Sequence, residues 1–374
     1  MVIPHRLLTQ QNASYLKEIV RRLWATFLYG LVLLFAHKRK YKRSRIVTLF
    51  YGGARSRGIG GPVVKVYRLK KYFPQKIGFF DAVYSLSNTP YLNQKTLQLI
   101  KDRGIPILHN QNGVFYPGWY RGNWESQNER MSLGYHAADY VFWQSEFCKR
   151  ASNKFLGDRK GDGEVLYNAV DTSVFSPKKR NSSSCFSYLI TGKFDTHVLY
   201  RVRAAIAGLA MVRKEGLNAE LKIGGWIERS DLVQDMIADF NLAGYVHLLG
   251  PYNQSTAPDI YRSADAFVML KYLDPCPNTV IEALSTGLPI VYSSSGGVPE
   301  LVGAEAGVGM PVPIDWFKLH TPNESQIAAS MLEVFEKRVP MGDAARQRAI
   351  EMFDITKWVN RHNEVLISLL ESRH

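Results

Sequence analysis

From residue 45 onward the chain alternates short apolar segments with helix-like segments, in two successive series. The strand candidates are rich in β-branched and aromatic residues, and they lie at 46–51, 82–86, 106–109 and 140–143, then at 188–192, 220–224, 246–250 and 266–270. Strands that alternate with helices form parallel sheets with helices on both faces. The sequence therefore predicts an α/β protein with two Rossmann-like, doubly wound domains.

A polar stretch separates the two series and suggests the domain boundaries. Residues 178–184 read K-K-R-N-S-S-S, which is typical of a linker. We expect an N-terminal segment at 1–44, a first domain at 45–178, a second domain at 179–355 and a C-terminal helix at 356–374 that packs back on the first domain. A length of 374 residues is enough for two such domains.

Positive charge is concentrated at the N-terminus. The net charge of the chain is +14, and residues 1–45 contain ten Lys or Arg against the single acid Glu18. The chain has no helix-turn-helix or zinc-finger pattern, so a nucleic-acid partner is not expected. Its three cysteines have no C-x-x-C spacing, which argues against a disulfide framework or a zinc site and fits a reducing cytosol.

An apolar run within this basic region favours a membrane surface. Residues 23–36 are apolar, Arg21 and Arg22 precede them, and the basic run 37–45 follows. Fourteen residues are fewer than the roughly 20 that a spanning helix needs. A basic, apolar N-terminal helix lying on an anionic membrane fits this pattern and predicts a cytoplasmic protein at the inner membrane face. An ordinary core helix remains the alternative.

The segment 274–291 carries the strongest indication of chemistry. It ends one strand, turns, opens a helix at Thr279 and returns as a strand after Gly287. Helix N-termini at the carboxyl edge of a parallel sheet bind diphosphates through free N–H groups and the helix dipole. Asp274 and Glu282 flank that site as possible ligands of sugar hydroxyls. Equally, Thr279 and Glu282 match a capping box, which would give Glu282 a purely structural role.

Several motifs together resemble family 4 of the retaining glycosyltransferases, which have the GT-B fold. The likeness covers I-Y-R-S-A-D-A-F-V at 260–268, the D-x7-E segment with G-L-P-I-V, and G-G-V-P-E-L-V at 296–302. The segment 168–177 is similar to the family's junction between domains. The resemblance extends over most of the chain after residue 45 and implies two Rossmann-like domains that face each other across a cleft.

The resemblance also implies roles for individual residues. Glu282 matches the acid that binds the ribose hydroxyls, and Asp274 matches the acid that contacts the transferred sugar, where the family usually has Glu. The amides around Pro277, Asn278 and Thr279 would face the diphosphate. The shorter side chain at position 274 leaves the identity of the sugar open.

A basic residue at the end of the first strand of the second domain fits the same scheme. Gly192-Lys193-Phe194 occupies the place of the family's G-R-L, whose Arg pairs with the diphosphate. Lys193 would supply the charge without the bidentate geometry. The family's second Lys falls at Val198, and Arg201 is a candidate substitute. A solvated loop charge is the alternative for Lys193.

The first domain contributes weaker candidates. Gly60 and Gly61 match a glycine loop that closes over the donor phosphate, and His109 resembles a histidine that approaches the 6-hydroxyl of the sugar. A structural histidine is an equal alternative. The aromatic and basic loop after the strand at 106–109 is a candidate acceptor site, because aromatics stack on sugars and Arg binds acidic groups; its residues are Trp119, Tyr120 and Arg121. A loop that packs over the core of the first domain is an equal alternative.

Together these features predict transfer of a hexose from a nucleoside-diphosphate sugar to a glycan or lipid-linked acceptor hydroxyl, with retention. Such a reaction fits the synthesis of surface polysaccharide, lipopolysaccharide or glycolipid. The chain has no D-x-D motif, so neither a metal nor a cofactor is expected. A dinucleotide-dependent oxidoreductase is less favoured because G-x-G-x-x-G is absent. A non-catalytic nucleotide-sugar-binding scaffold at the membrane is the second alternative.

Overall fold

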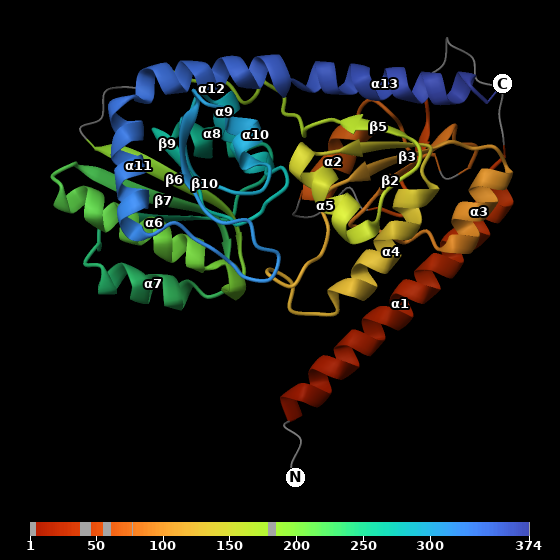
Figure 1. The fold of residues 1–374 in the computed structure, drawn as a ribbon, viewed down its shortest axis with the longest axis horizontal. Helices are drawn as coiled ribbons and strands as arrows, with labels where there is room; N and C mark the ends of the chain where they lie inside the picture. Colours follow the sequence, from red (N-terminus) through yellow and green to blue (C-terminus); the bar gives the residue numbers. More distant parts are fainter. Residues whose placement is uncertain (1–4, 38–45, 55–60, 77, 179–184, 374) are drawn as a thin grey trace.

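The computed structural model describes residues 5–37, 46–54, 61–76, 78–178 and 185–373. Two lobes lie side by side, each built around a parallel sheet, and two C-terminal helices run across both (Figure 1). The expected fold class, two doubly wound Rossmann-like domains, is confirmed.

The first sheet has the strand order β1-β2-β3-β4-β5 and is parallel throughout. An isolated parallel bridge between Leu49 and Gln75 extends it beyond β1. The chain therefore turns to one side of β1 at Gln75 and then adds β2 to β5 on the other side, so the boundary between β1 and β2 is a topological switch point. The strands of this sheet are β1 (Leu49–Phe50), β2 (Ala82–Leu86), β3 (Ile107–Gln111), β4 (Tyr140–Trp143) and β5 (Asp162–Val165).

Helices cover both faces of the first sheet. One apolar cluster joins the sheet to helices at the N-terminus and between later strands: α1 (His5–Phe35), α3 (Gln94–Asp102), α4 (Trp124–Ala137) and α5 (Glu146–Leu156). On the other face α2 (Gly61–Lys70) packs with α13 (Ile355–Glu371). Trp358 and Leu366 of α13 are buried in this cluster. His362 Nε2 forms a 3.1 Å hydrogen bond with the hydroxyl of Tyr84 on β2.

The second sheet has the order β11-β10-β9-β6-β7-β8, and all its pairs are parallel. Its switch point lies between β6 and β9, where successive connections lead in opposite directions. The strands are β6 (Phe186–Phe194), β7 (Ala219–Ile227), β8 (Val246–Gly250), β9 (Ala266–Met269), β10 (Ile290–Ser294) and β11 (Gly307–Pro311).

Two apolar layers enclose this second sheet. The first contains residues from α6 (Tyr200–Lys214), α7 (Ser230–Asp239) and α11 (Glu324–Glu336), with a short 3₁₀ turn at Thr196–Val198 leading into α6. The second contains residues from α8 (Ala257–Arg262), α9 (Asn278–Ser285), α10 (Val298–Val302) and α12 (Arg338–Met352). Burial of apolar side chains in both layers is the main stabilising contribution to this lobe.

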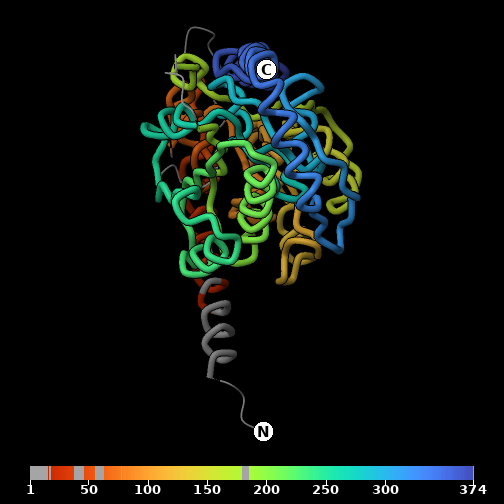
Figure 2. The backbone as a smooth tube through the Cα atoms, turned by 90° about the vertical axis from the view of Figure 1, so that its left-hand side faces the viewer, coloured from red at the N-terminus to blue at the C-terminus, as the bar shows by residue number. Residues whose placement is uncertain are grey.

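The N-terminal helix α1 is much longer than the apolar run that predicted it. It packs against α3 through Leu28 and Val32 and then extends away from the body of the molecule (Figures 1 and 2). Large apolar side chains remain exposed along its described part, including Leu16, Val20, Leu23, Phe27, Leu33 and Leu34. Within the described residues, no helix combines the length and apolarity needed to cross a membrane.

Candidate functional site

The switch point of the second sheet brings two candidate segments together. Lys193 is the penultimate residue of β6, and the Asp274 loop follows β9, which pairs with β6. Ligands of open α/β sheets bind outside the carboxyl ends of strands at such a point. The topology therefore brings Lys193 and the Asp274 loop to the kind of sheet edge at which open α/β sheets bind ligands.

The Asp274 loop is held in a tight turn. Leu273 has a φ of 50°, a left-handed conformation that a leucine rarely adopts. The Asp274 carboxylate accepts a 2.7 Å hydrogen bond from Lys271 Nζ and a 3.2 Å bond from the Cys276 amide. Each oxygen of the carboxylate thus accepts one hydrogen bond. The Asp274 side chain is 13% exposed.

The glycine pair after β10 explains how this turn packs. A Cβ on Gly296 would lie 2.4 Å from the carbonyl oxygen of Asp274, and one on Gly297 would lie 2.0 Å from that of Pro275. The Gly297 amide donates a 2.9 Å hydrogen bond to Asp274 O. Both glycines are required because the loop backbone approaches more closely than any side chain allows.

Helix α9 begins at Asn278, one residue before the expected start. Its N-cap is Pro277, and no side chain caps it. The capping-box interpretation of Thr279 and Glu282 is therefore wrong: Thr279 is the second helical residue, not the N-cap, so it cannot pair with Glu282 in that geometry. The first amides of the helix have no preceding intrahelical carbonyl and remain donors for an anion.

Glu282 lies one turn further along, at the contact between the two lobes. It is 4% exposed; Arg68 Nη2 donates to its Oε1 at 3.1 Å, and the Tyr261 hydroxyl donates to its Oε2 at 2.9 Å. Burial raises the pKa of the Glu282 carboxyl, while Arg68 and Tyr261 act in the opposite direction. The acid expected to bind ribose thus faces a cation from α2 of the first lobe.

The two basic candidates occupy very different environments. Lys193 is exposed, with Nζ 2.7 Å from Asp195 Oδ1 and 4.8 Å from the centre of the Trp226 ring. Arg201 is buried, donates to Lys193 O at 2.9 Å and lies over the Phe194 ring. Burial lowers the pKa of the Arg201 guanidinium, and the charge of Asp274 opposes that shift. Within the described part of the chain, Arg201 Nε has no hydrogen-bond partner.

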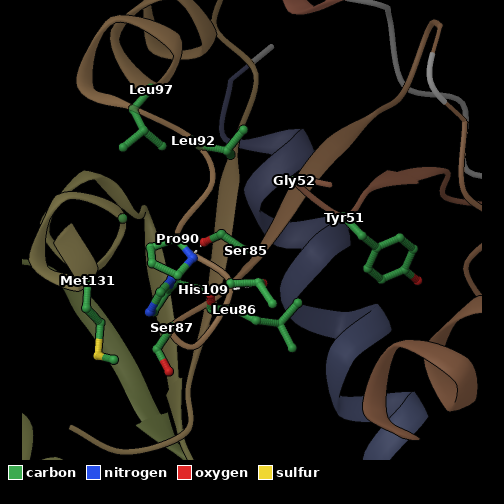
Figure 3. A pocket seen from close by; sticks show the side chains of 12 residues that line it. Tyr51, Gly52, Ser85, Leu86, Ser87, Pro90, Leu92, Leu97, His109 and Met131 are labelled. Carbon is green, nitrogen blue, oxygen red and sulfur yellow. Dashed lines mark hydrogen bonds between the residues drawn. The ribbon is translucent and has the colours of Figure 1, made fainter. Parts of the chain in front are cut away.

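His109 lines a pocket at the carboxyl ends of β1, β2 and β3 (Figure 3). Its Nδ1 lies 2.7 Å from Ser85 Oγ, and its Nε2 lies 2.9 Å from Gln111 Oε1. Burial lowers the pKa of His109 to about 4. The ring is therefore neutral near pH 7 with both nitrogens occupied, so contact with a sugar hydroxyl requires one of these bonds to be exchanged.

The predicted acceptor loop contacts the other lobe. The Trp119 ring stacks on Phe115 at 5.1 Å between centroids, and Tyr120 meets the same ring edge-on. The Gly118 amide donates a 2.7 Å hydrogen bond to the carbonyl of Trp316, whose indole packs against first-lobe aromatics. Arg121 is exposed. The loop belongs to the interface between lobes, and an acceptor role for it stays a prediction.

Two further predicted features have limited structural description. Gly60 lies outside the described residues, and Gly61 is the first residue of α2. No group of three or more His, Cys, Asp or Glu side chains with the arrangement of a metal site occurs in the described part of the chain.

Sequence reasoning missed the residues through which the lobes contact each other here. Nothing in the spacing of Arg68 pointed to Glu282. Glu300 belongs to the G-G-V-P-E motif, yet its role was not assigned: its carboxylate accepts from the amides of Glu146 and Phe147 at 2.7 and 2.8 Å, at the start of α5. The place of Glu300 in this motif, four residues after Gly296, is the sequence feature that could have indicated a specific role for its side chain.

Comparison with known proteins agrees with this geometry. Residues 186–336 match the family model described as Glycosyl transferases group 1. The chain is 26% identical over 229 residues, 56% of its length and 55% of the relative's, to the Escherichia coli UDP-Gal:alpha-D-GlcNAc-diphosphoundecaprenol alpha-1,3-galactosyltransferase. It is 23% identical over 190 residues, 50% of its length and 44% of the relative's, to the MMP alpha-(1->4)-mannosyltransferase of Mycolicibacterium hassiacum. The chain thus spans about half the length of these relatives.

Solved structures share the fold over most of the chain. Sucrose-phosphate synthase from Thermosynechococcus elongatus has a TM-score of 0.61 at 15% identity and covers 83% of this chain and 77% of its own. Anabaena HepE in complex with UDP-glucose has a TM-score of 0.61 at 16% identity and covers 82% of each chain. The chain therefore has the two-lobed GT-B fold, and its residues 186–336 are similar to the glycosyl transferases group 1.

Proposed function

We propose that this protein is a glycosyltransferase that moves a hexose from a nucleoside-diphosphate sugar to an acceptor hydroxyl, with retention at the anomeric carbon. One observation carries the proposal. At the switch point of the second sheet, the uncapped start of α9 lies next to a turn that holds Asp274, with Arg201 close by. Free amides and cations suit a diphosphate, and carboxylates suit sugar hydroxyls.

In this reaction the bond between the anomeric carbon and the diphosphate oxygen breaks, and negative charge grows on the leaving diphosphate. The amides at Asn278 and Thr279 and the cations Lys193 and Arg201 would stabilise that charge. The acceptor oxygen forms the new bond on the same face and gives its proton to the leaving group. Asp274 would hold the sugar, and Glu282 the ribose.

The relatives support a donor of this class. The Escherichia coli relative is a galactosyltransferase that acts with UDP-Gal on a diphosphoundecaprenol-linked sugar, and the Mycolicibacterium hassiacum relative is a mannosyltransferase. Anabaena HepE was solved with UDP-glucose. We infer a glycan or lipid-linked acceptor for this chain, in the synthesis of surface polysaccharide, lipopolysaccharide or glycolipid.

A membrane-bound acceptor fits the N-terminal helix. The exposed apolar side chains of α1, among them Leu23 and Phe27, occur on the same helix as the basic residues Arg21 and Arg22. Ten basic residues against one acid over residues 1–45 complement an anionic lipid surface. We infer that α1 attaches the protein peripherally to the cytoplasmic membrane face.

A donor screen tests the proposed function. Thermal unfolding is measured with UDP-, GDP- and ADP-sugars, for the natural chain and for Asp274→Asn. One sugar nucleotide should raise the Tm, because ligands that bind only the folded state stabilise it, and the variant should respond less. Release of the free nucleoside diphosphate with an acceptor present would distinguish an enzyme from a non-catalytic scaffold. No response to any sugar nucleotide would overturn the proposal.

A further inference from the structure

A buried lysine of α2 lies beside the start of α9 without a counter-charge. Lys65 is 5% exposed, and its Nζ donates to Asn110 Oδ1 at 2.6 Å and to Asn112 Oδ1 at 3.4 Å. Among the described residues it makes no ion pair. Burial of an ammonium group with only neutral partners is costly, so such a group is uncommon without a functional reason.

A chain of amide side chains connects this lysine to the proposed donor site. Gln144 Nε2 donates to Asn110 Oδ1 at 3.2 Å, and Asn168 Nδ2 donates to Gln144 Oε1 at 3.3 Å. Asn168 Nδ2 also donates to the carbonyl of Cys276, two residues before α9, at 2.9 Å. Two buried atoms of this cluster, Asn110 Nδ2 and Asn168 Oδ1, have no hydrogen-bond partner among the residues that the structure describes. The polar cluster is therefore incomplete as it stands, next to the helix end expected to bind the diphosphate.

The titratable groups around Lys65 supply no negative charge near neutral pH. Arg68 lies one turn along α2, Cys276 precedes α9, Cys148 lies on α5 and His362 lies on α13. Burial raises the pKa of both thiols to about 12 and lowers that of His362 to about 3. All three are then neutral at pH 7, while Arg68 is positive and is itself paired with Glu282, so the charge of Lys65 has no carboxylate partner among the described residues.

We propose that Lys65 is a proton-linked cation of the donor site, which takes up a proton from solvent when the diphosphate of the donor binds at the start of α9. This inference rests on the proposed function. In the free protein, burial lowers the pKa of Lys65 to about 7. A nearby diphosphate favours the charged form and so raises that pKa. Donor affinity is consequently highest below pH 7 and falls as the pH rises from about 7 toward the higher pKa of the complex.

Isothermal titration calorimetry tests this linkage. UDP-glucose, GDP-mannose and ADP-glucose are titrated in turn at pH 8 in two buffers that differ in ionisation enthalpy. The diphosphate of a nucleotide-sugar has no titrating oxygen near pH 8, so a proton taken up on binding belongs to the protein. We expect uptake of a large fraction of one proton with the natural chain.

Two variants assign the proton to Lys65. Lys65→Arg keeps the positive charge but remains protonated, so it should bind donor without proton uptake. Lys65→Met should bind more weakly and also without uptake; circular dichroism verifies its folding, and Lys65→Arg carries the test if Lys65→Met does not fold. Equal uptake in Lys65→Arg, or binding without uptake in the natural chain, overturns this inference alone. No binding of any nucleotide-sugar overturns the proposed function together with it.

Discussion

At the scale of single residues, the ion pair between Arg68 and Glu282 affects how Glu282 could bind ribose hydroxyls. The side chains are 13% and 5% exposed, and the pair joins the two lobes. A buried carboxylate that already has a cation and a Tyr261 hydroxyl as partners must exchange a bond to accept ribose hydroxyls. We therefore predict that donor binding and the contact between the lobes are coupled through this carboxylate.

Glu282→Gln tests that coupling. Removal of the charge leaves Arg68 partly buried without its counter-ion, so stability should fall by about 3 kcal/mol, as expected for one partner of a buried pair. Affinity for the nucleotide-sugar should fall by about 1.5–3 kcal/mol because charge-assisted bonds are lost. Urea unfolding and calorimetry measure the two effects.

A double-mutant cycle with Arg68→Gln provides the control for this pair. The double variant should be less destabilised than the sum of the single ones, because neither charge is then left alone. Strict additivity of the unfolding free energies would show that the two side chains do not interact in solution.

His109 predicts a pH dependence of stability with a definite sign. Its pKa is about 4 in the folded protein and about 6.5 when unfolded, so the unfolded chain binds the proton more tightly. The contribution is fully present above pH 6.5 and is lost as the pH falls toward 4, by about 3 kcal/mol. Urea unfolding at pH 7 and pH 4.5 should show a smaller decrease for His109→Gln than for the natural chain.

The exposed His197 gives the matched control for that measurement. His197→Gln should follow the natural chain at both pH values. If His109→Gln shows the same decrease as His197→Gln, then His109 is accessible to protonation in the folded state, which would favour its participation in the site.

At the scale of elements, buried strands were predictable from the sequence, while polar helices and irregular turns were not. The run 266–270 became β9 because uninterrupted apolar residues are typical of a strand buried on both faces. Helix α4 shows little separation of apolar and polar faces, and β11 contains Gly307, Gly309 and Pro311, so neither had a clear pattern. The left-handed Leu273 depends on tertiary packing and carries no local signal.

The close packing of the Asp274 turn on the glycine pair gives a test at this scale. A Cβ on Gly297 would meet the carbonyl oxygen of Pro275 at 2.0 Å and Ser145 Oγ at 2.8 Å. A backbone oxygen cannot move without shifting the turn, so Gly297→Ala should lower stability by about 1–3 kcal/mol and weaken donor binding. Thermal unfolding and calorimetry provide the readout.

Gly30 in α1 is the matched control for this substitution. No atom lies within 4 Å of a Cβ at this position, and its backbone is helical. Gly30→Ala should leave donor binding unchanged and stabilise the helix by about 1 kcal/mol or less. Equal donor affinity in both alanine variants would contradict the role assigned to the close approach at Gly297.

At the scale of the whole molecule, several hydrogen bonds join the two lobes. Glu300 accepts from the first amides of α5, Gly118 donates to Trp316, and Val170 forms a parallel bridge with Asp354 between α12 and α13. Motifs indicated the site within the second domain, but the partners from the first domain lie 153 and 154 residues away for Glu300 and 214 for Glu282. Such long-range pairs arise from the arrangement of the lobes, which no local pattern specifies.

The N-terminal helix gives the last prediction. Leu23, Phe27 and Leu34 are 65%, 53% and 66% exposed on α1. Serine at all three positions should strongly reduce sedimentation with vesicles of phosphatidylcholine and phosphatidylserine, because insertion of apolar surface drives interfacial binding. High salt should weaken binding of the natural chain without abolishing it, since each basic residue near an anionic surface contributes about 1 kcal/mol.

A second triple variant separates the effect of α1 from a general loss of apolar surface. Serine at Ile314, Phe317 and Val339 removes side chains that are 58%, 70% and 66% exposed in the second lobe. This variant should sediment with the vesicles as the natural chain does. Equal binding by both variants, or no sedimentation of the natural chain at low salt, would mean that the exposed face of α1 meets something other than lipid. The inference of a lipid-linked acceptor would then rest on the relatives alone, because α1 is the feature of this chain from which we infer attachment to a membrane.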